Sequence, residues 1–160
     1  MTIRVPGCNG SAGQAVSEET AFVLDSREAR LLVEVGFLAA AGGDVERADT
    51  IFGALQGVRP GRAYPAIGQA VALMNAGRAA VAAVRLEQAH GADAIEQAQI
   101  DAWRGLALQL SGRQAHSRKV LEQVATQGEG EGRSLARILL GWDDDGAPGA
   151  PDQPVGREQE

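Results

Sequence analysis

Side chains that could ligate a metal ion are scattered along this 160-residue chain. The two histidines, His90 and His116, lie in different parts of the sequence, and neither belongs to a group of cysteines and carboxylates spaced as metal ligands. The acidic run 143–145 lacks the additional oxygen ligands that complete a calcium loop. We therefore expect no metal site, and we interpret the acidic run as part of a solvated tail.

Catalytic and phosphate-binding patterns are also missing. The segment from Gly128 to Gly132 is rich in glycine, but its two glutamates would repel a phosphate group. No P-loop or dinucleotide-binding fingerprint occurs in the sequence. A nucleophile, a base and an orienting group do not come together at any recognisable spacing. The prediction is a protein that is not an enzyme and that needs no cofactor.

Charge is unevenly distributed along the chain. The net charge is -6, and residues 143–160 hold six acidic side chains against one arginine. Between Asp49 and Glu87 there is no acidic residue but there are four arginines, and a second basic stretch runs from Arg104 to Lys119. These stretches could attract an acidic partner or the acidic C-terminal run, although ordinary solvated surface is the simpler interpretation. Without a larger basic excess or interleaved aromatic residues, we expect no nucleic-acid partner.

The cysteine count and the hydropathy pattern point to the cytoplasm. Cys8 is the single cysteine, which excludes an internal disulfide and suits a reducing compartment. No run of about 20 apolar residues occurs, so we expect neither a membrane span nor a membrane partner.

A repeat provides the strongest signal in the sequence. Turns at Gly43, Gly77 and Gly112 recur at intervals of 34 and 35 residues. After each glycine a small residue follows five positions later, a large apolar one nine positions later, and an apolar one twelve positions later. The small residues are Ala48, Ala82 and Ser117, and the large apolar ones are Phe52, Leu86 and Leu121. The apolar residues at the twelfth position are Leu55, Ala89 and Val124. A period near 34 built from two helices indicates an array of stacked helical hairpins that share one core.

The elements expected from apolar periodicity are all helices. A first helical region begins near Ser17, and whether Asp25 and Ser26 divide it into two helices stays open. The later helices are expected at about 45–58 and 63–76, from after Gly77 to about residue 90, and at about 94–110 and 114–125, with a capping helix at 134–142. Residues 1–16 and 143–160 are expected to be disordered tails around a helical domain at 17–142.

The repeat resembles the tetratricopeptide (TPR) pattern. In the first unit Gly36 takes the small position of the first helix, and Ala48, Phe52 and Pro60 stand at their expected places. In the second unit either Ala70 or Gly68 takes the small position, and we favour Gly68. In the third unit Gly105, Gly112 and Ser117 carry a degenerate match. The resemblance implies an all-α, TPR-like α-solenoid of about three helix pairs with a C-terminal capping helix.

Three degenerate repeats with short flanks are similar to the small TPR chaperones of bacterial type III secretion systems. The stretch 48–77 resembles the passage between the first two repeats of the translocator chaperones. This resemblance implies a bacterial cytoplasmic protein that masks an export substrate, such as a needle, translocator or early-substrate subunit, alone or with a small co-chaperone. The alternative is a generic TPR scaffold that holds a subunit in a stable complex unrelated to secretion.

The resemblance also implies a peptide-binding groove lined by the first helix of each pair. The groove positions carry apolar side chains for the most part, beside Arg30 and Gln99. They are Val33, Phe37, Ala40, Tyr64, Ile67, Val71, Met74, Ala102, Leu106 and Gln109. TPR domains that clamp an acidic C-terminal tail place Lys and Asn where this chain has Val33 and Phe37, so that binding mode is not expected.

Each of the larger groove residues also has a plainer interpretation. Phe37, Tyr64, Ile67 and Met74 could complete the core between helices instead of lining a groove. The two tryptophans, Trp103 and Trp142, are expected to be packing residues near the C-terminal end. Apolar surface left open by the array suggests a homodimer or a bound partner.

Overall fold

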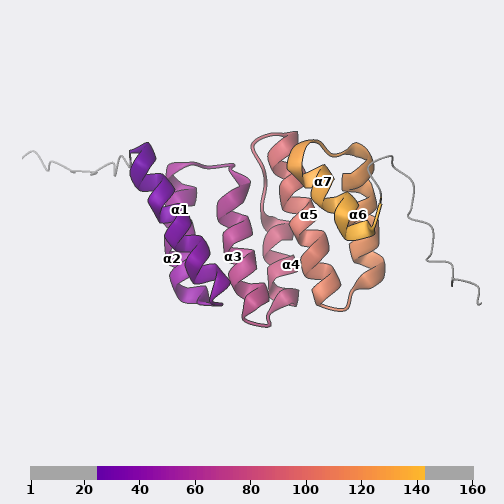
Figure 1. Ribbon diagram of the computed structural model, residues 1–160, viewed down its shortest axis with the longest axis horizontal. Coiled ribbons are helices and arrows are strands. Elements are labelled where there is room, and N and C mark those ends of the chain that lie inside the picture. Colours follow the sequence, from indigo (N-terminus) through magenta and orange to yellow (C-terminus); the bar gives the residue numbers. More distant parts are fainter. Residues whose placement is uncertain (1–24, 143–160) are drawn as a thin grey trace, which may run out of the picture.

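The computed structural model describes residues 25–142, and this range folds into seven α-helices without a strand (Figure 1). The chain is therefore all-α over the described range. The helices are α1 (Ser26–Ala41), α2 (Val45–Val58), α3 (Ala63–Asn75), α4 (Ala79–Gln88), α5 (Ala94–Leu110), α6 (Gln114–Gln127) and α7 (Gly130–Leu140). The expected tails and the helix start near Ser17 lie outside the described residues.

The start of α1 is fixed by a capping box at Asp25. The Asp25 carboxylate accepts hydrogen bonds from the backbone N–H groups of Arg27 (2.6 Å) and Glu28 (3.0 Å). The Glu28 side chain in turn accepts from the Asp25 backbone N–H at 3.1 Å. Three backbone N–H groups that have no partner within the helix are thereby satisfied, so α1 begins at Ser26.

The last helix starts earlier than the sequence suggests. We expected it at Ser134, but α7 begins at Gly130, within the glycine-rich segment. A Cβ atom added to Gly132 would lie 2.3 Å from the backbone carbonyl carbon of Ala98. The glycine therefore lets α7 approach the backbone of α5 closely, which is a packing role and not a loop signal.

The three repeated glycines form equivalent turns. Gly43, Gly77 and Gly112 have φ values of 69, 73 and 81°, a left-handed conformation that favours glycine. After each glycine, the next backbone N–H donates to the carbonyl five residues earlier, at 3.0 Å to Ala39, 2.7 Å to Leu73 and 2.9 Å to Leu108. These bonds belong to the Schellman motif that ends helices at glycine. The sequence repeat is therefore also a repeat of backbone geometry.

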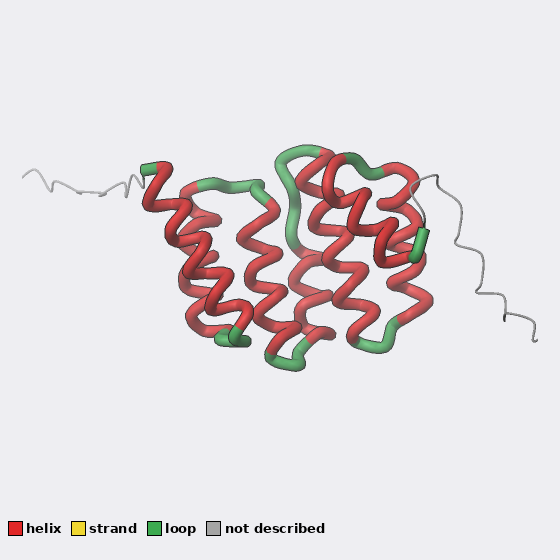
Figure 2. The backbone as a smooth tube through the Cα atoms, in the orientation of Figure 1, coloured by secondary structure: helices red, strands yellow, loops and turns green. Residues whose placement is uncertain are grey.

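The helices are stacked in sequence order, with loops alternating between the two ends of the stack (Figure 2). The odd-numbered helices contact one another in succession, α1 with α3, α3 with α5, and α5 with α7. Helices α2, α4 and α6 each pack against the odd-numbered helices before and after them and do not pack on one another. One layer of the stack is thus formed by α1, α3, α5 and α7, and the other by α2, α4 and α6.

Phe52 of α2 joins the first two hairpins. Its side chain is fully buried, and its ring lies against Gly36 of α1 and Gly68 of α3. A Cβ atom at Gly36 would lie 2.8 Å from the nearest ring carbon, and one at Gly68 would lie 2.2 Å away. Three helices can therefore meet around this ring only because two of them present glycine.

This contact shows that our preferred register for the second unit is wrong. Gly36 and Gly105 each face the large residue sixteen positions later, Phe52 and Leu121. Gly68 instead faces Phe52, which belongs to the preceding hairpin. Ala70 stands sixteen positions before Leu86 and shares a buried cluster with it, so Ala70 holds the equivalent place.

Replacing Gly68 with alanine should destabilise the protein. The added methyl group would overlap the fully buried ring of Phe52, and overpacking of this kind costs about 1 to 3 kcal/mol. Gly53 of α2 is the matched control, because no atom lies within 4 Å of its Cβ position. Gly53→Ala should raise the free energy of unfolding by about 0.5 to 1 kcal/mol through helix propensity. Urea denaturation of both variants measures the contrast, and equal effects would contradict this packing.

A buried glutamate ties the third and fifth helices together. No side chain from its own N-terminal residues caps α3; instead, Glu96 of α5 accepts from the backbone N–H of Ala63 at 2.5 Å. Its other carboxylate oxygen lies 2.8 Å from Nη1 of Arg62. Close by, the backbone N–H of Ala92 donates to the carbonyl of Gly61 at 2.8 Å. The cap of one hairpin is thus supplied by the next.

Glu96→Ala should lower the free energy of unfolding by about 1 to 3 kcal/mol, because the fully buried N–H of Ala63 would lose its acceptor. Arg62→Ala should cost less than about 1 kcal/mol, since the Arg62 side chain is more than half exposed. Chemical denaturation of both variants measures the two free energies of unfolding. If Arg62→Ala lowers the free energy of unfolding as much as Glu96→Ala does, the ion pair, and not the cap, holds α3 and α5 together.

Candidate functional site

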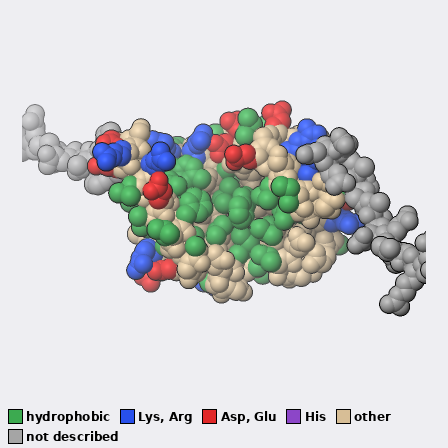
Figure 3. Space-filling model, viewed as in Figure 1, with side chains coloured by type: hydrophobic (Ala, Val, Ile, Leu, Met, Phe, Trp, Pro, Cys, Tyr) green, Lys and Arg blue, Asp and Glu red, His purple; other side chains and the backbone are tan. Residues whose placement is uncertain are grey.

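The main candidate site is a pocket between the odd-numbered helices. It has a volume of about 370 Å³ and receives side chains from α1, α3, α5 and α7. We call it the central pocket. Its lining residues are Phe37, Tyr64, Ile67, Gln99, Trp103, Glu131, Gly132 and Leu135. In the space-filling view, hydrophobic side chains gather on this side of the stack (Figure 3).

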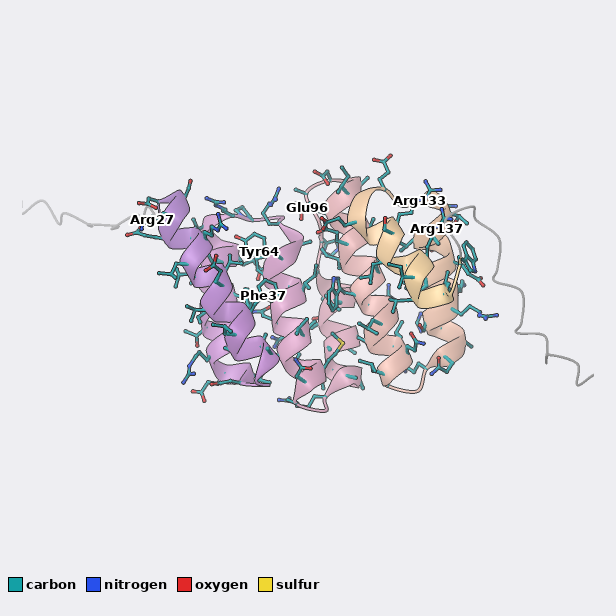
Figure 4. All side chains as sticks on the ribbon, viewed as in Figure 1. Arg27, Phe37, Tyr64, Glu96, Arg133 and Arg137 are labelled. Atoms are coloured by element: carbon teal, nitrogen blue, oxygen red, sulfur yellow. The ribbon has the colours of Figure 1, made fainter. Side chains whose placement is uncertain are left out.

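Aromatic side chains form the part of the pocket between α1 and α3. Phe37 and Tyr64 project from neighbouring helices into the space between them (Figure 4). Phe37 meets Phe52 edge to face, with ring centroids 5.1 Å apart and an interplanar angle of 69°. Because Phe52 is fully buried, this contact fixes one edge of the Phe37 ring while the remainder faces the pocket.

The polar part of the lining comes from α5 and α7. Gln99 Nε2 donates to Glu131 Oε2 at 3.3 Å, which links the two helices across the pocket. Glu131 is the one charged residue in the lining. The lining therefore offers aromatic and aliphatic surface with an amide and a carboxylate at one side, which suits the apolar side chains of a polypeptide.

Four of the predicted groove positions meet in this pocket. Phe37, Tyr64, Ile67 and Gln99 line it, from three different helices. Phe37 and Tyr64 also pack against the core formed by α1, α2 and α3, and Ile67 belongs to the core formed by α3, α4 and α5. Phe37, Tyr64 and Ile67 therefore line a pocket and pack on the core at the same time.

Two predicted groove residues belong to the core, and their assignment to the groove is wrong. Ala40 is fully buried against α2 and α3, and its carbonyl accepts from Asn75 Nδ2 at 2.9 Å. Ala102 is fully buried among residues of α6 and α7, including Leu121 and Val124. Both are small residues at places where helices approach one another closely, so no surface remains for a ligand.

The other predicted positions are partly buried but lie outside the central pocket. Val33 packs on the core of α1, α2 and α3, Val71 contacts both this core and the core of α3, α4 and α5, and Met74 packs on the latter. Leu106 is also partly buried, and Gln109 lines a separate hollow of about 400 Å³ near α6 and the end of α7. Met74 thus contributes to the core, and its place in a groove stays a prediction.

Sequence reasoning missed the residues that α5 and α7 add to the pocket. Trp103 was expected to be a packing residue, and it does pack on the core of α3, α4 and α5, but it also lines the pocket. Its position four residues after Gln99 places both on one helix face, a signal that could have found it. Leu135 was missed because α7 was treated only as a cap.

Comparisons of the chain with models of known protein families, with curated proteins and with solved structures gave no match. Within residues 25–142, none of the helices combines the length and apolar character needed to cross a membrane. Over the same range, His, Cys, Asp and Glu side chains form no group of three or more that could hold a metal ion.

Proposed function

We propose that the chain is a TPR-like α-solenoid of three helix pairs, closed by α7, that binds a polypeptide segment in the central pocket. Three features support the solenoid: the equivalent glycine turns, the alternating antiparallel hairpins, and the succession of contacts between α1, α3, α5 and α7. The function is one of binding and not of catalysis.

The observation that carries the proposal is the composition of the central pocket. Each of the four odd-numbered helices contributes to one apolar hollow, so a single bound segment would contact every layer of the stack. A buried aliphatic or aromatic side chain contributes roughly 1.5 to 3 kcal/mol before ordering costs. Three anchors on an amphipathic segment would contribute at most about 9 kcal/mol, which corresponds to micromolar binding at best.

The partner that fits best is a secreted subunit that would aggregate or polymerise if left unbound. We propose, from the resemblance in the repeats, that the protein is a cytoplasmic chaperone of a bacterial type III secretion system. It would mask a needle, translocator or early-substrate subunit until export, alone or with a small co-chaperone. A scaffold in a stable complex would use the same pocket but keep its partner permanently.

Site-directed photo-crosslinking in the native cells tests the proposal. A photoreactive amino acid at Leu135, in the central pocket, should crosslink to an export substrate that mass spectrometry then identifies. The same probe at Val84 of α4, an exposed residue that does not line the central pocket, should not. Crosslinks confined to a subunit that is never exported would favour the scaffold. Equal crosslinking from both positions would contradict binding in the pocket.

A further inference from the structure

Half of the aromatic residues of this chain meet at the central pocket. The sequence contains three phenylalanines, two tryptophans and one tyrosine. Phe37 of α1, Tyr64 of α3 and Trp103 of α5 line the pocket, so three separate helices each supply one ring. The face of an aromatic ring carries partial negative charge and attracts the cationic groups of arginine and lysine. The lining therefore offers surface that can receive a cation as well as an apolar group.

Glu131 adds a negative charge to this aromatic surface. Its Oε2 atom accepts from Gln99 Nε2 at 3.3 Å, which orients the carboxylate. Within residues 25–142 the Glu131 side chain makes no other hydrogen bond and no ion pair, so Oε1 is open to a donor from a bound partner. The residue is exposed in the unbound protein. A segment that fills the pocket would cover the carboxylate, and a covered carboxylate without a donor is unfavourable.

Charged residues that flank the lining on α3 and α5 are already paired. Arg62, just before α3, places Nη1 2.8 Å from Glu96 Oε1, and Arg104 Nη2 lies 2.6 Å from Glu87 Oε1. Arg133 follows the pocket glutamate by two residues on α7, and residues two apart do not face each other on a helix. The described part of the chain therefore supplies no cation to the carboxylate at the pocket.

An arginine side chain satisfies both parts of this lining. Its aliphatic stem can pack on apolar residues such as Ile67 and Leu135 while its charged head reaches the polar side of the pocket. The planar guanidinium group stacks on aromatic faces and donates two hydrogen bonds to one carboxylate, a geometry that the ammonium group of lysine does not offer. We propose that the polypeptide segment bound in the central pocket inserts an arginine whose guanidinium group lies against Trp103 and donates to Glu131, an inference that rests on the proposed function.

Selection from a phage-displayed library of random peptides tests which side chain the pocket prefers. Peptides that bind the full chain should be enriched in arginine next to apolar residues. Selection on Glu131→Gln should keep the apolar residues and lose the enrichment of arginine. Selection on Glu131→Lys should replace arginine with aspartate or glutamate, because like charges at a contact are rejected. Since Glu131 is exposed, the circular dichroism spectra of both variants should match that of the unaltered protein.

Affinities of one selected peptide measure the contact directly. A second peptide carries citrulline in place of the arginine, which keeps the shape of the side chain but removes its charge. The full chain should bind the arginine peptide at least about 10-fold more tightly than the citrulline peptide. Glu131→Gln should reduce this difference to less than about twofold, because the charged acceptor is lost. Isothermal titration calorimetry provides the four dissociation constants.

Glu129→Gln is the matched control. Glu129 is also exposed and directly precedes α7, but it does not line the central pocket. Both substitutions remove one negative charge at the same helix end, so they affect the helix dipole alike. Glu129→Gln should leave the preference for arginine over citrulline unchanged. An equal loss of this preference in both variants would show a general effect of charge and would overturn the contact with Glu131.

The outcomes also separate this contact from the proposed function. Selected peptides that are apolar but not enriched in arginine, or that bind equally well with citrulline, would overturn the arginine contact. Polypeptide binding in the central pocket would still stand if these peptides lose affinity in Trp103→Ala, because Trp103 lines the pocket. If the library yields no peptide whose binding depends on Trp103, both the proposed function and the arginine contact are wrong.

Discussion

Replacing Phe52 with alanine is expected to remove about 3 to 5 kcal/mol from the free energy of unfolding, the range for deletion of a buried phenylalanine ring. The ring is fully buried and is enclosed by α1, α2 and α3. The surrounding helices cannot collapse onto the space, because Gly36 and Gly68 have no side chains that could move into it. Since small domains are stable by about 5 to 15 kcal/mol, the variant should lose a large share of its stability, measurable by urea or thermal unfolding.

Phe37→Ala is the matched control for this prediction. Phe37 touches Phe52 edge to face but also lines the central pocket, so its side chain is only partly buried. Its removal should cost clearly less stability than removal of Phe52. If the two variants unfold at the same denaturant concentration, Phe37 is a core residue and its assignment to the pocket fails.

The hairpin framework was predictable because glycine turns leave a local signature. Gly43, Gly77 and Gly112 end helices through backbone bonds that involve only neighbouring residues, so their positions in the sequence set the loops. The bounds of α2 and α5 were predicted correctly for the same reason, since each lies between strong turn signals. Periodic apolar residues then define which side of each helix is buried.

Residues whose role depends on a neighbouring helix were predicted less well. Gly68 was matched to the repeat pattern by its small size, but its size serves contact with Phe52 of the preceding hairpin. Gly132 fell outside the expected helices, whereas it lies in α7 and allows that helix to approach Ala98 of α5. In both cases the residue type indicates close approach, and only the packed structure shows which helix approaches.

The pocket was predictable only in part for a related reason. A first-helix position can face the pocket or the next hairpin, and a small rotation of the helix decides between them. Phe37 and Ile67 line the pocket, whereas Ala40 and Ala102 turn into the core. Glu131 and Leu135 come from α7, which lies beyond the three recognisable repeats, so no repeat position pointed to them.

Trp103→Ala is expected to have the largest effect on partner binding. Trp103 lies in the central pocket between residues from α3 and α7, and buried tryptophan is enriched among residues whose truncation costs 2 kcal/mol or more at interfaces. We expect the dissociation constant for the crosslinked partner segment to rise at least about 30-fold. Isothermal titration calorimetry with that segment as a peptide provides the measurement.

The second tryptophan offers both a control and an independent readout. Trp142 follows α7, packs against the core of α5, α6 and α7, and does not line the central pocket. Trp142→Phe should therefore leave the affinity within about twofold, because it keeps an aromatic side chain at a position outside the contact. It also leaves Trp103 as the single indole, whose emission should shift to the blue when the peptide excludes water from the pocket. An unchanged spectrum at saturating peptide would place the bound segment elsewhere on the stack.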